Sequence, residues 1–237
     1  MIETLFAFGD RDLAAHVMVT DVTRQVVPTR RFNRTTVPGM DGELVSPNGL
    51  EAMEVTVSGI ILGYEMEEVA RMRREIASML LADRPQALRL PDEPGTYLMA
   101  YYEGGTEPSR LMQCPDVEFK FLCPDPVAFG EARAVSFSGS RHVSVGGTYR
   151  AWPVVTAKPA SGPSWKITNE ATGEFVLVRA SFTGAQTVVL DMRSGRCTVN
   201  GTDHDVDLSS DFFGIEGDVD LSISNGTATI SWDERWV

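Results

Sequence analysis

Lysine, histidine and cysteine are scarce in this sequence, with three of each among 237 residues. Acidic residues outnumber basic ones by 33 to 21, which gives a formal charge of −12. Because phosphate contacts need clustered Lys and Arg, this balance argues against a nucleic-acid-binding protein and against docking on anionic lipid. An odd number of cysteines without a Cys-x-x-Cys pair argues against a disulfide framework and a thiolate zinc site. Cys114, Cys123 and Cys197 are therefore predicted to be small core residues.

Long apolar runs are absent as well. No window reaches the ~18 consecutive apolar residues of a membrane-spanning helix. The first ten residues contain Glu3 and no basic residue, which does not fit a secretory signal peptide. A composition with 43% hydrophobic and 23% charged residues is ordinary for a globular chain. We therefore expect a soluble chain that is made in the cytoplasm.

The length allows one large domain or two modest ones. Residues 1–130 hold 20 acidic and 12 basic residues (net −8), whereas residues 131–237 hold 13 and 9 (net −4). Pro124 and Pro126 interrupt a strand pattern, and a helical period occurs only before them. We place the boundary just after Gly130, which predicts an N-terminal domain of residues 1–130 and a C-terminal domain of residues 131–237.

The first domain is predicted to be mainly β. Period-two alternation over Met53–Ile61 and over 117–123 predicts strands with one buried face. Further strands are expected at residues 2–8, 30–37, 87–90 and 96–102, and another within 13–19 after a turn at Gly9. Residues 38–42 read as a loop in which Gly39 and Gly42 are free to adopt positive φ.

One amphipathic helix is predicted in this domain. From Met66, apolar residues recur at three-to-four spacing, and charged residues fill the remaining positions. The helix should end by about Asp83, because Pro85 cannot continue it. Its charged face, including the pair Glu67–Arg71, is interpreted as a solvated surface, with a contact face between subunits as the alternative.

The second domain shows no helical period of useful length. Short runs separated by turns predict strands at 154–157, 165–168, 175–180, 187–190, 197–199, 219–223 and 228–232. Asn200-Gly201 and Asn225-Gly226 each lie between two such runs, and Asn-Gly favours the type I′ turn of a tight hairpin. This pattern predicts an antiparallel β-sandwich or a jelly roll.

The sequence offers little that resembles a catalytic centre. None of His16, His142 and His204 lies in a Gly-x-Ser-x-Gly elbow or in a cysteine-protease signature. No Gly-x-x-x-x-Gly-Lys-Ser/Thr loop is present to hold a phosphate. Four tryptophans could stack on sugar rings, but in a sandwich they are more often core or interface anchors; they are Trp152, Trp165, Trp232 and Trp236.

One acidic cluster could suggest a metal site, and it consists of Asp203, His204, Asp205 and Asp207. An EF-hand that starts at Asp203 would need Gly and Glu where the chain has Leu208 and Gly214. We interpret the cluster as a solvated acidic hairpin edge that opposes strand-to-strand aggregation. We therefore expect no catalytic, cofactor-binding or metal-binding residue, no cofactor and no enzyme activity.

Several short motifs resemble the distal tail proteins (Dit) of long-tailed phages, the siphovirus tail-component family. The similar segments, in order, are residues 6–13, 37–42, 88–97, 119–126, 169–174, 190–191, 200–201 and 231–236. They include Pro-Gly-Met-Asp-Gly at 38–42, Asp-Glu-Pro at 92–94 and Asp-Pro at 125–126. Each motif is short, but their order extends over essentially the whole chain.

This resemblance implies a structural hub of a phage or prophage tail tip. In that family the N-terminal domains form a hexameric ring, with a β-sandwich, one helix and an extended hairpin. The C-terminal domain is a galectin-like β-sandwich. The ring joins the tail tube to the tail-associated lysin or fibre protein and can carry receptor-binding proteins, so the expected location is the virion tail tip. The His-x-Asn-x-Arg pattern of true galectins is absent, so a lectin role does not follow.

Two other functions remain as alternatives. One is a carbohydrate-binding adsorption module of the tail tip, and the other is a small tail-tip hydrolase. For the hub, residues 1–130 supply −8 of the −12 net charge, which predicts a mostly acidic ring lumen. An acidic wall repels phosphates, so DNA would pass through the channel without specific binding. The same carboxylates could instead lie on the outer surface and keep the protein soluble.

Overall fold

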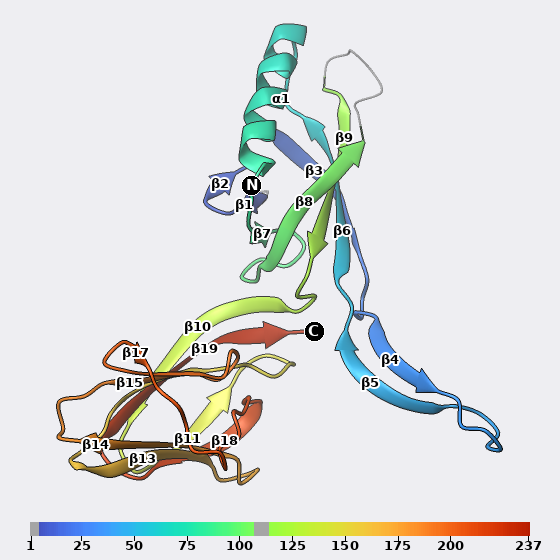
Figure 1. Cartoon of the computed structure of the whole chain (residues 1–237). Coiled ribbons are helices and arrows are strands. Elements are labelled where there is room, and N and C mark those ends of the chain that lie inside the picture. Colours follow the sequence, from blue (N-terminus) through green and yellow to red (C-terminus); the bar gives the residue numbers. More distant parts are fainter. Residues whose placement is uncertain (1–4, 107–113) are drawn as a thin grey trace. The chain divides into compact units, whose positions relative to one another are not determined.

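The structure is a computed structural model that describes residues 5–106 and 114–237. It divides the chain into two compact units (Figure 1). The first ends at Ala128, and the second extends from Phe129 to Trp236. Each unit has a hydrophobic core of its own.

The first unit contains one helix and nine strands among its described residues. They are β1 (Ala7–Phe8), β2 (Arg11–Asp12), β3 (Val17–Arg24), β4 (Arg30–Thr35), β5 (Leu44–Leu50), β6 (Met53–Ile61), α1 (Met66–Leu80), β7 (Gln86–Arg89), β8 (Leu98–Thr106) and β9 (Asp116–Cys123). Seven strands form one sheet in the order β2-β1-β7-β8-β9-β6-β3, and β4 and β5 form a two-stranded sheet of their own.

Strand β8 connects the two halves of the larger sheet. Its residues 98–100 pair with β7, and its residues 101–106 pair with β9. The halves contact each other through aromatic rings: Phe8 lies 5.6 Å from Phe121, and Phe6 lies 5.9 Å from Phe119, between ring centroids. Burying such rings is a large hydrophobic gain. This packing is the sandwich expected for the first domain.

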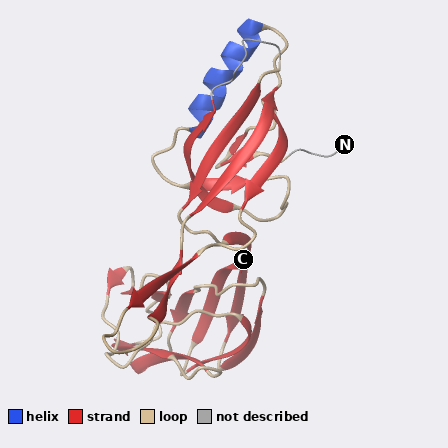
Figure 2. Cartoon of the chain, turned by 90° about the vertical axis from the view of Figure 1, so that its right-hand side faces the viewer, coloured by secondary structure: helices blue, strands red, loops and turns tan. Residues whose placement is uncertain are grey.

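Helix α1 lies along this sheet (Figure 2), with Ile76 and Leu80 buried in the core. The expected apolar stripe is confirmed, and the helix ends at Leu80, before the limit near Asp83 that Pro85 sets. Its last turn contains no basic residue, and Leu81 is already extended with ψ 106°. On the exposed face, Arg71 pairs with Glu75 at 3.9 Å, one turn beyond the Glu67–Arg71 pair that the sequence suggested.

The start of the chain differs most from expectation. Of the strand predicted at residues 2–8, residues 2–4 lie outside the described residues, and only Ala7–Phe8 forms β1. The strand expected within 13–19 begins at Val17. The backbone N–H groups of His16 and Val17 both donate to the carbonyl of Leu13, at 3.0 and 2.9 Å. That tight turn uses the backbone groups that an earlier strand would need.

Every element of the second unit is a strand. They are β10 (Ala128–Phe137), β11 (Ser140–Val145), β12 (Val154–Lys158), β13 (Gly162–Asn169), β14 (Phe175–Phe182), β15 (Val188–Asp191), β16 (Arg196–Val199), β17 (Thr202–Asp203), β18 (Gly217–Ile223) and β19 (Thr227–Trp236). A six-stranded sheet in the order β10-β19-β12-β15-β16-β17 packs on a four-stranded sheet in the order β11-β18-β13-β14. The predicted sandwich is confirmed.

The two Asn-Gly turns do different things. Asn200 (φ 52°) and Gly201 (φ 81°) form the predicted tight turn, which joins the paired strands β16 and β17. Asn225-Gly226 does not make a hairpin, because β18 and β19 belong to opposite sheets. There the Asn225 side chain accepts from the Ala160 N–H at 2.9 Å and donates to the Ser164 carbonyl at 3.3 Å. These bonds fix a crossover between the sheets.

Candidate interaction surfaces

The three histidines lie in three separate places, each with a partner. His16 Nε2 lies 2.8 Å from the Glu75 carboxylate, and His142 Nδ1 lies 2.9 Å from that of Asp220. His204 Nδ1 contacts the carbonyl oxygen of Asp205 at 2.7 Å. Within residues 5–106 and 114–237, no group of three or more His, Cys, Asp or Glu residues could hold a metal ion.

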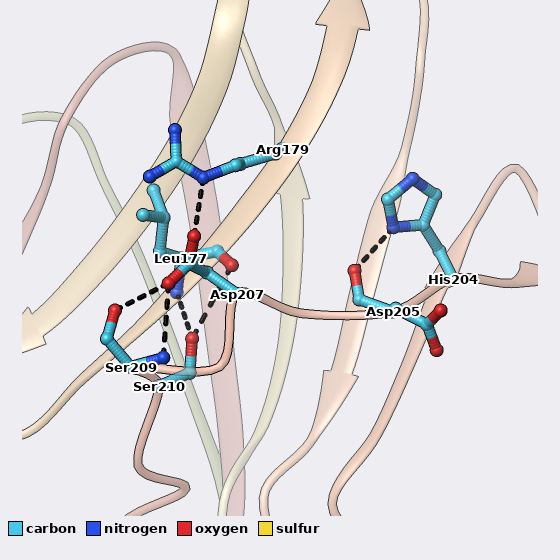
Figure 3. Close-up of polar contacts among 7 residues, drawn as sticks. All are labelled: Leu177, Arg179, His204, Asp205, Asp207, Ser209 and Ser210. Atoms are coloured by element: carbon cyan, nitrogen blue, oxygen red, sulfur yellow. Dashed lines mark hydrogen bonds and ion pairs between the residues drawn. The ribbon is translucent and has the colours of Figure 1, made fainter.

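Strand β14 is an edge strand, and the segment 207–211 covers it (Figure 3). The Asp207 N–H donates to the Leu177 carbonyl at 2.8 Å, and the Ser210 hydroxyl accepts from the Leu177 N–H at 3.0 Å. The Asp211 N–H continues this pattern by donating to the Phe175 carbonyl at 2.8 Å. The segment therefore occupies backbone groups that would otherwise be available to another strand.

The four residues of the acidic cluster lie at or before the start of this segment and form no group that could hold a metal ion. Asp207 accepts from the Ser209 hydroxyl at 2.6 Å and pairs with Arg179. The hydrogen bond from the Ser209 hydroxyl has the largest effect on the pKa of Asp207, and the bond from Arg179 the next largest. Together they hold that pKa well below its usual range. Asp203 pairs with Arg196 at 2.7 Å. The carboxylates are thus used in local structure.

The thiols of the two buried cysteines are poor nucleophiles near neutral pH. Cys123 and Cys197 are buried, and burial raises the pKa of Cys123 to about 12 and that of Cys197 to about 11. A thiol with so high a pKa forms little thiolate near neutral pH. Cys114 was also expected in the core but is only partly buried, at φ 49°.

The tryptophans mostly serve the second unit's core. Trp165 and Trp232 are buried, and Trp165 Nε1 donates to the Asn225 carbonyl at 3.1 Å. Trp152 packs on the same core with part of its surface accessible, and Trp236 is exposed. The interpretation as core anchors therefore applies fully to two of the four.

The Asp-Glu-Pro motif at residues 92–94 forms ion pairs with strand β3 that the sequence did not predict. Arg24, at the end of β3, binds both carboxylates of the Asp-Glu-Pro motif, Asp92 at 2.9 Å and Glu93 at 2.7 Å. These three residues connect segments that are far apart in the sequence, so no local pattern predicts the contact.

The β4–β5 hairpin of the first unit, residues 30–50, is almost entirely exposed, and we call it the arm (Figure 1). Every residue of β4 is exposed, and so is every residue of β5 except Leu50. Phe32 pairs with Pro47 across the strands, and Val45 lies on the same face, two positions before Pro47 in β5. Phe32 is 47% and Val45 51% exposed. This apolar face lacks a packed layer in the single chain.

The loop at the tip of the arm has the predicted conformation. Gly39 and Gly42 have φ values of 82° and 89°, and nothing lies within 4 Å of either Cβ position. The arm as a whole carries three arginines against two carboxylates. Because residues 1–130 sum to −8, the rest of that segment carries −9. The arm is thus a basic, partly apolar element attached to an acidic unit.

Comparison with known proteins gives a consistent result for both units. A family model described as a phage tail protein RIFT-related domain matches residues 18–123. A second, described as a siphovirus-type tail component C-terminal domain, matches residues 146–236. No helix in the described part of the chain is long and apolar enough to span a bilayer.

The individual proteins that resemble this chain are also phage tail and baseplate proteins. The distal tail protein of Bacillus phage SPP1 is 26% identical over 202 residues, covering 83% of this chain and 80% of that protein. The crystal structure of SPP1 Dit, described as a paradigm of the hub adsorption apparatus in phages infecting Gram-positive bacteria, gives a TM-score of 0.84 at 20% identity and covers 98% of this chain and 99% of that one. A chain of the phage P2 baseplate in its activated, calcium-containing conformation gives 0.51 at 10% identity, with 94% and 92% covered.

Proposed function

Because this chain belongs to the siphovirus-type tail-component family, we propose that it is a structural hub in the tail tip of a long-tailed phage or prophage. In this role six copies form a ring between the tail tube and the tail-associated lysin or fibre protein. Receptor-binding proteins attach to the same hub. The 26% identity to the SPP1 distal tail protein over most of both chains supports this assignment.

The exposed arm is the main structural support for the proposed ring. A two-stranded hairpin on its own is at best marginally stable in water. Here it also exposes Phe32 and Val45 on one face, which a monomer gains nothing by displaying. Because both side chains are already about half covered, burying the remainder against another copy would contribute about 0.7–1.5 kcal/mol each. Repeated head to tail, such a contact closes a ring when the rotation between copies allows it.

Charge favours a second copy as the arm's partner. The arm is slightly basic, and the remainder of residues 1–130 is strongly acidic at −9. An arm docked on a neighbouring copy therefore meets opposite charge, which guides orientation and accelerates encounter. The acidic excess that remains would line or surround the channel, so that DNA passes without specific binding.

The proposed role is non-enzymatic. His16 and His142 are each paired with a carboxylate, and the acidic cluster is engaged in edge covering and in Arg pairs. A His–carboxylate pair occurs in structural contacts as well as in catalytic ones, so these contacts alone do not indicate an active site. The relatives are also named for tail structure.

Mass measurement of the purified chain tests the ring. We expect light scattering at tens of micromolar to give six times the 26.0 kDa chain mass. The double variant Phe32→Thr/Val45→Thr keeps β-propensity but removes the apolar face, so it should stay monomeric with an unchanged melting temperature. Leu208→Thr, which alters a fully exposed leucine of the second unit, is the matched control and should assemble normally. A wild-type chain that is strictly monomeric would contradict the proposal.

A further inference from the structure

The second unit contains a pocket of about 410 Å³ whose lining combines aromatic rings with charges of both signs. Its aromatic residues are Phe129 and Trp152, and its charged residues are Asp191, Arg193, Asp233 and Arg235. The volume lies within the range of small-molecule sites, roughly 300–1,000 Å³. All of these residues belong to one compact unit, so the pocket does not depend on ring formation.

The pocket lies on the outer face of the six-stranded sheet. Val155, Leu190 and Ile230 point into the core. Their chain neighbours Val154 and Asp191 pair with each other across β12 and β15 and therefore point outward. Along β19, Asp233 and Arg235 occupy alternate positions whose side chains also point outward. The floor of the pocket is thus built on strands, which hold its side chains more precisely than loops do.

Arg235 is the buried charge of the pocket. It is only 5% exposed although it is on the outer face, because two rings cover it. Its guanidinium carbon lies 5.1 Å from the Phe129 ring centroid and 5.4 Å from that of Tyr149. Its carbonyl accepts from the N–H groups of Thr148 and Tyr149 at 2.9 and 3.0 Å. Arg235 is therefore held in place before any ligand arrives.

Asp191 is a second pocket residue that hydrogen bonds hold in place. One carboxylate oxygen accepts from the backbone N–H groups of Arg193 and Ser194 at 2.9 and 3.2 Å, and the other accepts from the Ser194 hydroxyl at 2.7 Å. These bonds, led by the one from the Ser194 side chain, lower the pKa of Asp191, so the group is ionised near neutral pH. Groups that are ordered in advance reduce the entropic cost of binding.

We propose that this pocket binds a neutral saccharide. Two arginines and two aspartates sum to no net charge, which suits neither an anion nor a cation. Arginine only donates hydrogen bonds and an ionised aspartate only accepts them, whereas each sugar hydroxyl does both. The accessible part of Trp152 offers an apolar surface for the C–H face of a sugar ring. A hub with such a site would contact cell-surface glycan directly.

The test uses the full chain and a panel of uncharged probes: lactose, maltotriose, chitotriose and mannobiose. Binding is followed by tryptophan fluorescence and by ligand-observed NMR up to about 10 mM probe, where weak millimolar affinities are detectable. We expect at least one probe to bind. Asp233→Asn should weaken that binding at least about tenfold, and Trp152→Ala should abolish it. Asp205→Asn, an exposed acid outside the pocket, is the matched control and should bind as the wild type does.

Because Trp152 also packs on the core, binding by the Asp233→Asn variant decides the test if the Trp152 variant unfolds. No binding by any probe overturns the proposal, and so does binding that Asp233→Asn leaves unchanged. The ring is tested by measuring the mass of the assembly, and the saccharide site is tested by measuring binding. Either proposal can therefore fail without the other.

Discussion

At the scale of single residues, Gly226 and Gly201 have nearly the same backbone conformation in very different surroundings. Their φ values are 74° and 81°. A Cβ at Gly226 would lie 2.2 Å from the Lys158 carbonyl oxygen, whereas nothing lies within 4 Å of the Cβ position at Gly201. The two sites therefore separate the cost of positive φ from the cost of a steric clash.

We expect Gly201→Ala to lower the free energy of unfolding of the second unit by about 1–2 kcal/mol, the cost of left-handed backbone for an L-residue. Gly226→Ala should cost clearly more, because the carbonyl it meets belongs to a paired strand and cannot move freely. All four tryptophans lie in the second unit, so denaturation followed by tryptophan fluorescence reports this unit alone. Equal losses in the two variants would contradict the crossover described for Asn225-Gly226.

This pair also shows what a dipeptide can and cannot predict. Each Asn-Gly pair correctly indicated a sharp turn, and both Gly201 and Gly226 have positive φ. Whether the turn joins paired strands or strands of opposite sheets depends on Asn225 bonding to residues 160 and 164, some sixty positions earlier. Local sequence contains no information on that contact. The hairpin prediction was right for Asn200 and wrong for Asn225 for this reason.

At the scale of elements, helix α1 begins without a good cap. Its N-cap residue, Glu65, makes no side-chain capping hydrogen bond. Three residues later, Glu68 accepts from the Tyr64 backbone N–H at 3.1 Å. This bond satisfies the residue before the N-cap and not the N-cap N–H that a capping box uses, and a short hydroxyl side chain at position 65 would supply the missing side-chain cap.

Glu65→Ser should raise the free energy of unfolding of the first unit by about 0.5–1 kcal/mol, the usual contribution of a good N-cap. Glu67→Ser is the matched control: it makes the same change within the first turn, where an acid favours the positive end of the helix, so it should be neutral or slightly destabilising. The helical circular dichroism signal follows the first unit, because α1 belongs to it. Equal effects of the two variants would show that capping is not limiting here.

The predictability of most elements followed burial; β4 is the exception, since a strand was expected at residues 30–37 although every residue of β4 is exposed. Strands β6 and β9 were predicted well, because alternate residues such as Val55, Val57 and Phe121 are buried and produce a clear period of two. Strands β10 and β11 were missed, since most of their residues are exposed. The arm's apolar face and the pocket were missed too. Both depend on register between strands, such as Phe32 opposite Pro47, which composition does not determine.

At the scale of the whole molecule, the division into two cores predicts two separate unfolding units. A fragment of residues 129–237 retains all of the second unit's sheets and core residues. We expect it to fold alone, with cooperative melting and a free energy of unfolding of about 5–15 kcal/mol. Tryptophan fluorescence of the fragment should match that of the full chain. A molten or insoluble fragment would contradict the division of the chain into two independently folding units after Ala128.

The first and last strands of the second unit are neighbours in its six-stranded sheet. Arg133 bonds to Glu234, and Ser136 to Thr229, so position numbers rise along β10 as they fall along β19. The chain therefore enters and leaves this sandwich at one end of one sheet edge. A domain whose two ends lie close together can be replaced by another sandwich. It can also be inserted into a loop of a different protein without changing the course of the flanking chain. Tension applied across those ends would unzip β10 from β19 one hydrogen bond at a time, which makes this edge the mechanical weak point of the unit.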